Sequence, residues 1–217
     1  VPAGPACSSV LKAPLRHRYF ALRHGVSKAN VAKLIISDPK VGTRRFGLTA
    51  AGRTAAAKSA KAFAAKATRR TLIVSSDFTR TRETARVFAG TLRALPVKGD
   101  SRRRCCPVRI SPLLRERLFG TLEGGPNSRY EEVWAVDRRD PGARPFGAES
   151  AKAVVRRTAG LVARLDRDLP DDGSDVVLVS HGDALQLLQT AFQGIDASKH
   201  RSLPHLDPAE LRELVLK

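Results

Sequence analysis

The sequence contains no methionine, few cysteines, few aromatic residues and no long apolar run. Its three cysteines are Cys7, Cys105 and Cys106, and no two of them have the Cys-x-x-Cys spacing. An odd number of cysteines without that spacing argues against a disulfide framework and a zinc site, and favours a reducing compartment. No segment approaches the roughly 18 uncharged apolar residues of a membrane-spanning helix, so we expect no transmembrane segment.

Acidic residues are also scarce. The chain has 21 Asp and Glu against 39 Lys and Arg, which gives a formal net charge of +18. Such a charge attracts anions, including nucleic acid and acidic membrane surfaces. The basic residues form scattered doublets and triplets that do not share one helical face, so we favour a solvated, arginine-rich surface over a dedicated polyanion partner. A polyanion or a large assembly as the partner is the alternative.

The length of 217 residues and the hydrophobic fraction of 42% suit one domain with a continuous core. Residues 1–15 are rich in Pro, Ala and Gly and are interpreted as a loose N-terminal arm, which leaves residues 16–217 as the single domain. The chain starts at Val1 and lacks methionine, so we expect a processed or trimmed form. We expect a location in the cytoplasm or in an organelle matrix, either mitochondrial or plastid.

Apolar runs and helical periodicities alternate along the chain. Strands are predicted at residues 17–23, 71–75, 108–110 and 176–180, and helices at 48–66, 78–95, 150–169 and 183–192, with a short helix near 128–136. Strands that alternate with helices of this length indicate parallel strand–helix–strand units. We therefore predict an α/β fold, a three-layer α/β/α sandwich with a mostly parallel central sheet.

The ends of three predicted strands carry similar polar residues. Arg23 ends the first strand and His24 and Gly25 follow it, Arg80 lies just beyond the second strand, and His181 and Gly182 follow the last. In parallel sheets, ligands bind outside the carboxyl ends of the strands. Arginines gathered beside helix N-termini are typical of a phosphate site, and glycines let backbone amides approach the ligand closely.

Five segments, in order along the chain, point to one family. They are RHGVSKAN (residues 23–30), FGLTAAGRTAA (46–56), SSDFTRTRETA (75–85), LRERLFGTLEG (114–124) and VVLVSHGDALQLL (176–188). Together they resemble the motifs of the histidine phosphatase superfamily, also called the phosphoglycerate mutase-like superfamily. The resemblance spans most of residues 17–192 and implies the phosphoglycerate mutase-like fold.

The resemblance also implies roles for individual residues. His24 would be the nucleophile that forms a phosphohistidine, and Glu116 the general acid and then the base for water. Arg23, Arg80 and His181 would hold the phosphoryl oxygens. The implied substrate-binding residues are Gly25, Ser27, Asn30, Arg117 and Gly182. Neither a metal nor a cofactor is expected, because arginines can neutralise the phosphoryl charge, and the expected partner is a small phosphorylated substrate.

The choice between hydrolysis and transfer depends on the segment between Glu116 and His181. Mutases of the family carry a longer insertion there, whereas residues 125–149 show nothing that predicts an extra lid. A shorter, more open site admits water, so we predict a metal-independent histidine acid-base phosphatase, a phosphatase-type member. The alternatives are phosphoglycerate mutase-type phosphoryl transfer, or a basic structural subunit of an RNA-containing or organellar assembly that keeps the enzyme fold.

Several residues are left with two interpretations or with a structural one. Tyr130 and Trp134 are either packing residues or a wall that faces the substrate. His17, His200 and His205 belong to no motif and are expected to be structural or at the surface. Two positions depart from the family pattern: Val26 replaces a usual Glu or Gln, and Asp77 replaces a frequent Pro and is a candidate ion-pair partner of Arg80.

Overall fold

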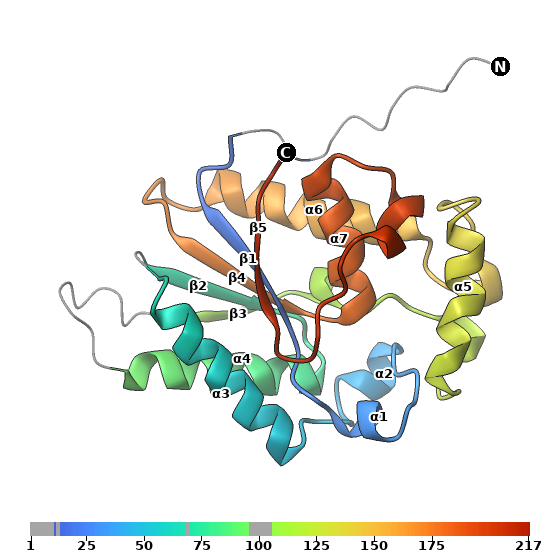
Figure 1. The fold of residues 1–217 in the computed structure, drawn as a ribbon, viewed down its shortest axis with the longest axis horizontal. Helices are drawn as coiled ribbons and strands as arrows, with labels where there is room; N and C mark the ends of the chain where they lie inside the picture. Colours follow the sequence, from blue (N-terminus) through green and yellow to red (C-terminus); the bar gives the residue numbers. More distant parts are fainter. Residues whose placement is uncertain (1–10, 12–13, 68–69, 96–105) are drawn as a thin grey trace.

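The computed structural model describes residue 11 and residues 14–67, 70–95 and 106–217 (Figure 1). Most of the predicted N-terminal arm, including Cys7, and most of the basic segment 98–106, including Cys105, lie outside the described residues. Cys106 is described and is buried. No helix of the described ranges is long and apolar enough to cross a membrane.

A five-stranded sheet forms the centre of the molecule. Its strands are β1 (Arg18–Arg23), β2 (Thr71–Ser75), β3 (Val108–Ile110), β4 (Asp175–Ser180) and β5 (Leu211–Leu214). They lie in the order β3-β2-β4-β1-β5, and only the edge strand β5 is antiparallel to its neighbour. The predicted mostly parallel sheet is therefore confirmed, whereas β5 was not predicted.

Helices cover both faces of this sheet (Figure 1). On one face lie α3 (Ala50–Ala64) and α4 (Thr79–Ala94), and on the other lie α6 (Ala151–Asp168) and α7 (Gly182–Gln193). Successive strand residues point to opposite faces. In β1, Tyr19 joins the apolar cluster under α6 and α7, and Phe20 joins the cluster with Phe63 of α3 and Phe88 of α4. The three-layer prediction is confirmed.

Short elements surround the carboxyl edge of the sheet. They are the α-helices α1 (Lys28–Val31), α2 (Pro39–Gly42) and α5 (Tyr130–Asp137), and the 3₁₀ turns η2 (Pro112–Leu114), η3 (Gly120–Leu122), η4 (Asn127–Arg129), η5 (Pro145–Gly147) and η6 (Ala197–Ser202). A small apolar cluster that includes Ile35, Phe119 and Val133 joins the loop after α1 to α5. In Figure 1, α5 lies apart from the sheet and faces α1 and α2.

Hydrogen-bonding side chains fix the starts of two long helices. Thr49 is the N-cap of α3, as predicted, and its hydroxyl accepts the backbone N–H of Gly52 at 3.0 Å. Ser150 caps α6 in the same way by accepting the N–H of Ala153. Each cap satisfies a backbone donor that the first helical turn leaves unpaired. The Thr49 hydroxyl also donates to the carbonyl of Val26 at 3.0 Å, which holds the loop after β1 against the start of α3.

Candidate active site

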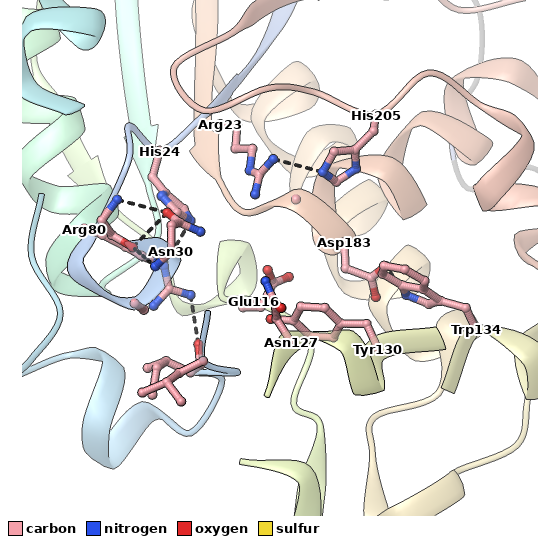
Figure 2. Close-up of a pocket in the computed structure, with 15 residues that line it drawn as sticks. Arg23, His24, Asn30, Arg80, Glu116, Asn127, Tyr130, Trp134, Asp183 and His205 are labelled. Atoms are coloured by element: carbon pink, nitrogen blue, oxygen red, sulfur yellow. Dashed lines mark hydrogen bonds between the residues drawn. The ribbon is translucent and has the colours of Figure 1, made fainter. Parts of the chain in front are cut away.

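The carboxyl ends of three neighbouring parallel strands bring the predicted residues together (Figure 2). His24 directly follows β1, Arg80 lies in the first turn of α4 after β2, and His181 is the N-cap of α7 after β4. Arg80 Nε lies 3.0 Å from His24 Nε2 and 3.2 Å from His181 Nδ1. The two imidazole rings have centroids 5.2 Å apart.

The His24 ring has a defined tautomer. Its Nδ1 lies 2.8 Å from the carbonyl oxygen of Gly25, which can only accept, so Nδ1 carries the proton. Nε2 therefore keeps its lone pair, on the side of Arg80. Burial, followed by the charges of Arg80 and Arg23, lowers the pKa of His24 well below its usual value. At neutral pH the imidazole is uncharged, the form in which it can act as a nucleophile.

Two arginines leave donors unused beside this nitrogen. Arg80 gives one Nη to the carbonyl of Ile36 at 2.9 Å, while its other Nη is buried and has no partner among the described residues. Arg23 donates to the Leu206 carbonyl at 2.7 Å and lies 2.9 Å from His205 Nε2, and its buried Nε is likewise without a partner in the described chain. Buried unpaired donors on cations fit an anionic ligand.

His181 lies behind these groups, fully buried. Its Nδ1 accepts from Arg80, so its Nε2 carries the proton and donates to Ser76 Oγ at 3.0 Å. Burial and the charge of Arg80 lower the pKa of His181 well below the usual value. His181 is not among the residues that line the pocket. In this geometry its ring supports Arg80, and its role as a phosphoryl clamp stays a prediction.

Glu116 reaches the site from the loop after η2. Its Oε1 accepts the backbone N–H groups of Arg117 at 3.0 Å and of Ala184, in the first turn of α7, at 3.1 Å. Oε2 has no hydrogen-bond partner among the described residues. Burial, followed by the nearby charge of Asp183, raises the pKa of Glu116. A fixed carboxyl with a raised pKa can carry a proton to a leaving group.

All of these residues except His181 line one cavity of about 210 Å³. The predicted residues that line it are Arg23, His24, Ser27, Asn30, Arg80, Glu116 and Gly182. The others in the lining are Ala29, Leu34, Ile36, Asn127, Tyr130, Trp134, Asp183 and His205. In Figure 2, Glu116 lies between the His24–Arg80 pair and a wall that carries Tyr130 and Trp134.

Arg117 does not line the cavity, so the structure does not bring it together with the other predicted site residues. Its side chain is 0% exposed and forms a bidentate ion pair with Asp137, with distances of 2.5 and 2.8 Å. Its Nε donates to the carbonyl of Glu149 at 2.7 Å. A buried guanidinium needs several acceptors, and these leave it no free face.

Gly25 is also absent from the lining, and a packing constraint accounts for this glycine. A Cβ at Gly25 would lie 2.4 Å from the backbone oxygen of Gly52 in α3. Position 25 must lack a side chain because two backbones approach each other closely there, and not because a ligand does. Asp77 pairs with Arg115 at 2.5 Å and not with Arg80, so the predicted partner was the wrong arginine.

Three polar lining residues, Asp183, Asn127 and His205, were missed as members of the site. Asp183 was detectable, because it directly follows His181 and Gly182 and so lies at the same strand end. Asn127 begins the three-residue 3₁₀ turn η4 and His205 lies on an irregular segment, and neither has a periodicity in the sequence that places its side chain. The expectation that His205 has only a structural or surface role is incomplete, because it contacts Arg23 in the pocket.

Fold and site together define a class of α/β proteins with paired strand-end histidines and arginines around one cavity. The chain belongs to the histidine phosphatase superfamily (branch 1), whose family model matches residues 19–217. Its relatives carry the names of phosphatases and of phosphoglycerate mutases.

Two curated relatives illustrate this range. The "Probable phosphoglycerate mutase GpmB" of Erwinia tasmaniensis is 32% identical over 61% of this chain. That alignment spans 58% of the relative's own length. The "Broad-specificity phosphatase" of Saccharomyces cerevisiae is 29% identical over 79% of this chain and 68% of its own.

Solved structures agree with the fold over almost the whole chain. A native mycobacterial glucosyl-3-phosphoglycerate phosphatase has a TM-score of 0.71 at 27% identity, and covers 91% of this chain and 89% of its own. A structure described as "Mycobacterial hydrolase 1" has a TM-score of 0.72 at 26% identity, and covers 91% and 90%.

Proposed function

We propose that the protein hydrolyses phosphomonoesters through a phosphohistidine formed on His24, with Glu116 as the general acid and base. The observation that carries this proposal is the uncharged Nε2 of His24 beside the unpaired buried donors of Arg80 and Arg23. A neutral imidazole attacks phosphorus effectively only where the phosphoryl charge is already held. Membership in the superfamily supports the same reaction class.

In the first step, His24 Nε2 forms a bond to phosphorus as the bond from phosphorus to the alcohol oxygen breaks. Arg80 Nε, which now donates to His24 Nε2, would turn to a phosphoryl oxygen, together with the unpaired donors of Arg80 and Arg23. Glu116 gives its proton to the leaving oxygen, so the product is a neutral alcohol. The arginines stabilise the charge that spreads over the phosphoryl oxygens in the transition state.

In the second step, the Glu116 carboxylate takes a proton from a water molecule that attacks the phosphohistidine. The nitrogen–phosphorus bond breaks, inorganic phosphate leaves, and His24 and Glu116 regain their starting forms. Division into two displacements replaces one difficult step with two easier ones. Ser27, Asn30 and Gly182 line the phosphate side of the cavity in this proposal, and His181 acts through Arg80.

Transfer to a second alcohol, as in a mutase, is the other candidate, and the name of the Erwinia relative is the observation that favours it. We favour water as the acceptor, because the yeast relative is named a phosphatase and aligns with a larger share of this chain than the Erwinia relative does. Mutase transfer also requires a site that tolerates a second anionic group on the substrate.

Covalent labelling tests the proposal. The protein is mixed with a phosphomonoester labelled on phosphorus and quenched in alkali, in which phosphohistidine survives. We expect label on the native protein and none on His24→Ala, because the proposal gives the role of nucleophile to no other lining residue. His17→Ala is the matched control: His17 is buried, precedes β1, and its ring nitrogens have no partner among the described residues. Label retained on His24→Ala would contradict the proposal.

A further inference from the structure

The cavity has two zones with different chemistry. The inner zone holds Arg23, Arg80 and His24. The outer wall is defined as Asn127, Tyr130, Trp134 and Asp183. In Figure 2, Tyr130, Trp134 and Asp183 lie on the other side of Glu116 from His24, and Asn127 overlaps Glu116 in this view. Because Glu116 would protonate the leaving oxygen, the alcohol part of a substrate must lie against this outer wall. The chemistry of the wall therefore selects the alcohol.

The outer wall has no positive charge. Arg23 and Arg80 are the only Lys or Arg among the described residues that line the cavity, and the phosphoryl group needs both. His205 adds no cation at neutral pH, because burial and the charge of Arg23 lower its pKa to about 4. Arg201 lies close by, but its guanidinium sits 3.8 Å from the centre of the Trp134 ring and it does not line the cavity.

The wall carries a negative charge instead. Asp183 is buried, and its two oxygens are occupied: Oδ1 accepts from Trp134 Nε1 at 2.9 Å, and Oδ2 lies 3.4 Å from Arg117 Nη1. A second anionic group on the substrate would face this carboxylate and find no cation in the described lining. Like charges brought together oppose binding.

Two stacked aromatic rings form a second part of the wall. The rings of Tyr130 and Trp134 have centroids 5.5 Å apart and planes inclined by 21°. Trp134 is held between the hydrogen bond to Asp183 and the guanidinium of Arg201, and Tyr130 packs on Phe119 with centroids 4.6 Å apart. Rings that are fixed in this way offer a rigid surface to a planar or ring-shaped group.

We infer that the site selects phosphomonoesters of uncharged, ring-bearing alcohols and discriminates against substrates with a second anionic group, such as phosphoglycerates. This inference rests on the proposed function, since it places the alcohol beyond Glu116. It names Asn127, Tyr130, Trp134 and Asp183 as specificity-determining residues. A mutase that acts on phosphoglycerate would need a cation in this wall, where the described lining has none.

Binding to a variant that cannot turn over tests the inference. The dissociation constants of 4-carbamoylphenyl phosphate and 4-carboxyphenyl phosphate are measured on His24→Ala by calorimetry. The two ligands have the same shape and differ by one negative charge. We expect the carboxylate to bind at least about 10-fold more weakly. Equal affinities, tighter binding of the carboxylate, or no measurable binding of the carbamoyl compound would overturn the inference.

A charge placed in the wall supplies the second comparison. Asn127→Arg, added to His24→Ala, should bring the dissociation constants of the two ligands closer together, because the carboxylate compound should bind more tightly. Ser128→Arg is the matched control, since Ser128 is exposed, adjacent and outside the lining. Equal effects of the two substitutions would show that overall charge, rather than the wall, decides, and would overturn the assignment of Asn127.

The ring surface is tested with smaller probes. Tyr130→Leu in the same background should weaken the binding of phenyl phosphate several-fold and leave the affinity for methyl phosphate unchanged. Equal weakening of both would remove the aromatic part of the inference. Turnover of phenyl phosphate by the native protein is measured separately, so a failure of the proposed hydrolysis is distinguished from a failure of the substrate class.

Discussion

The two oxygens of the Glu116 carboxyl have different surroundings. Oε1 is held by two backbone N–H groups, whereas Oε2 has no partner in the described chain and belongs to a group whose pKa is raised. Glu116→Gln keeps an oxygen for those two donors but has no acidic proton. The substitution therefore separates the acid role from the shape of the site.

We expect Glu116→Gln to slow phosphoenzyme formation by roughly 10²–10⁴-fold for an alkyl phosphate, whose alkoxide leaves poorly without a proton. The nitrophenolate of a nitrophenyl phosphate leaves without much protonation, so the rate of phosphoenzyme formation from that substrate should fall far less. Single-turnover measurements isolate this step from the later hydrolysis. Equal losses for the two substrates would remove Glu116 from the acid role and leave the arginine site intact.

Asp183 links the wall to the acid through charge. Its carboxylate helps to raise the pKa of Glu116, and the reaction needs Glu116 protonated, so the alkaline limb of kcat/KM against pH reports that pKa. Asp183→Asn should move this limb to lower pH. The acid limb from His24 lies well below pH 6.5 and should stay there.

Glu131→Gln is the matched control for Asp183→Asn. Glu131 is exposed on α5 and pairs with Arg138, so the same charge change there should leave the alkaline limb in place. An unshifted limb in Asp183→Asn would mean that burial alone sets the pKa of Glu116. A limb that shifts equally in both variants would show a general effect of net charge.

Single residues were predictable where a strand end fixed them. His24 and His181 follow apolar runs, and parallel pairing of β1 with β4 brings Arg23 opposite Ser180 in register. The position of Arg117 was not predictable in the same way. The sequence placed it beside Glu116, but an extended loop turns successive side chains in different directions, and Asp137 holds it inside.

At the scale of elements, Gly25 and Gly52 allow the loop after β1, which carries His24, to pack closely against α3. A Cβ at Gly52, in the first turn of α3, would lie 2.2 Å from the backbone oxygen of Val26, two residues after His24. Backbone cannot yield as a side-chain tip can, so α3 or the loop must move. Gly90 lies exposed in the middle of α4, and a Cβ there would meet no atom within 4 Å.

We expect Gly52→Ala to lower the free energy of unfolding by about 1–3 kcal/mol and to reduce turnover. Gly90→Ala should raise the free energy of unfolding by about 0.5–1 kcal/mol, because alanine loses less backbone entropy in a helix. Urea denaturation of both variants measures the difference. Stabilisation by both substitutions would show that α3 and the loop are not packed as closely as the structure has them.

Elements with strong periodicity were predicted within a few residues, as for α6 and β4. The strand β5 was missed, because Leu211–Leu214 is short and half-polar and becomes a strand only by pairing with the open edge of β1. The segment 125–149 was predicted to lack a lid. It nevertheless forms one wall of the cavity through Tyr130 and Trp134, a tertiary placement that composition does not encode.

At the scale of the whole molecule, the net charge of +18 far exceeds what the cavity uses. Among the described residues only two arginines line the cavity, and Arg80 is buried. The remaining excess creates a positive field at the surface, which attracts any polyanion independently of the phosphate site. Surface attraction and catalysis should therefore be separable in one preparation of the protein.

We expect a single-stranded RNA oligomer to bind with an affinity that falls at least about 10-fold between 50 and 200 mM salt, as counterion release requires. Fluorescence anisotropy measures this, with a peptide nucleic acid of the same sequence as the uncharged control. Turnover of a small phosphomonoester should stay within about two-fold at saturating RNA, since a cavity of about 210 Å³ admits one small ester and no polymer.

Equal binding of the uncharged oligomer would contradict the electrostatic account. Abolished turnover would instead mean that the basic surface crosses the mouth of the cavity, and salt-independent RNA binding without any turnover would favour a structural subunit over an enzyme.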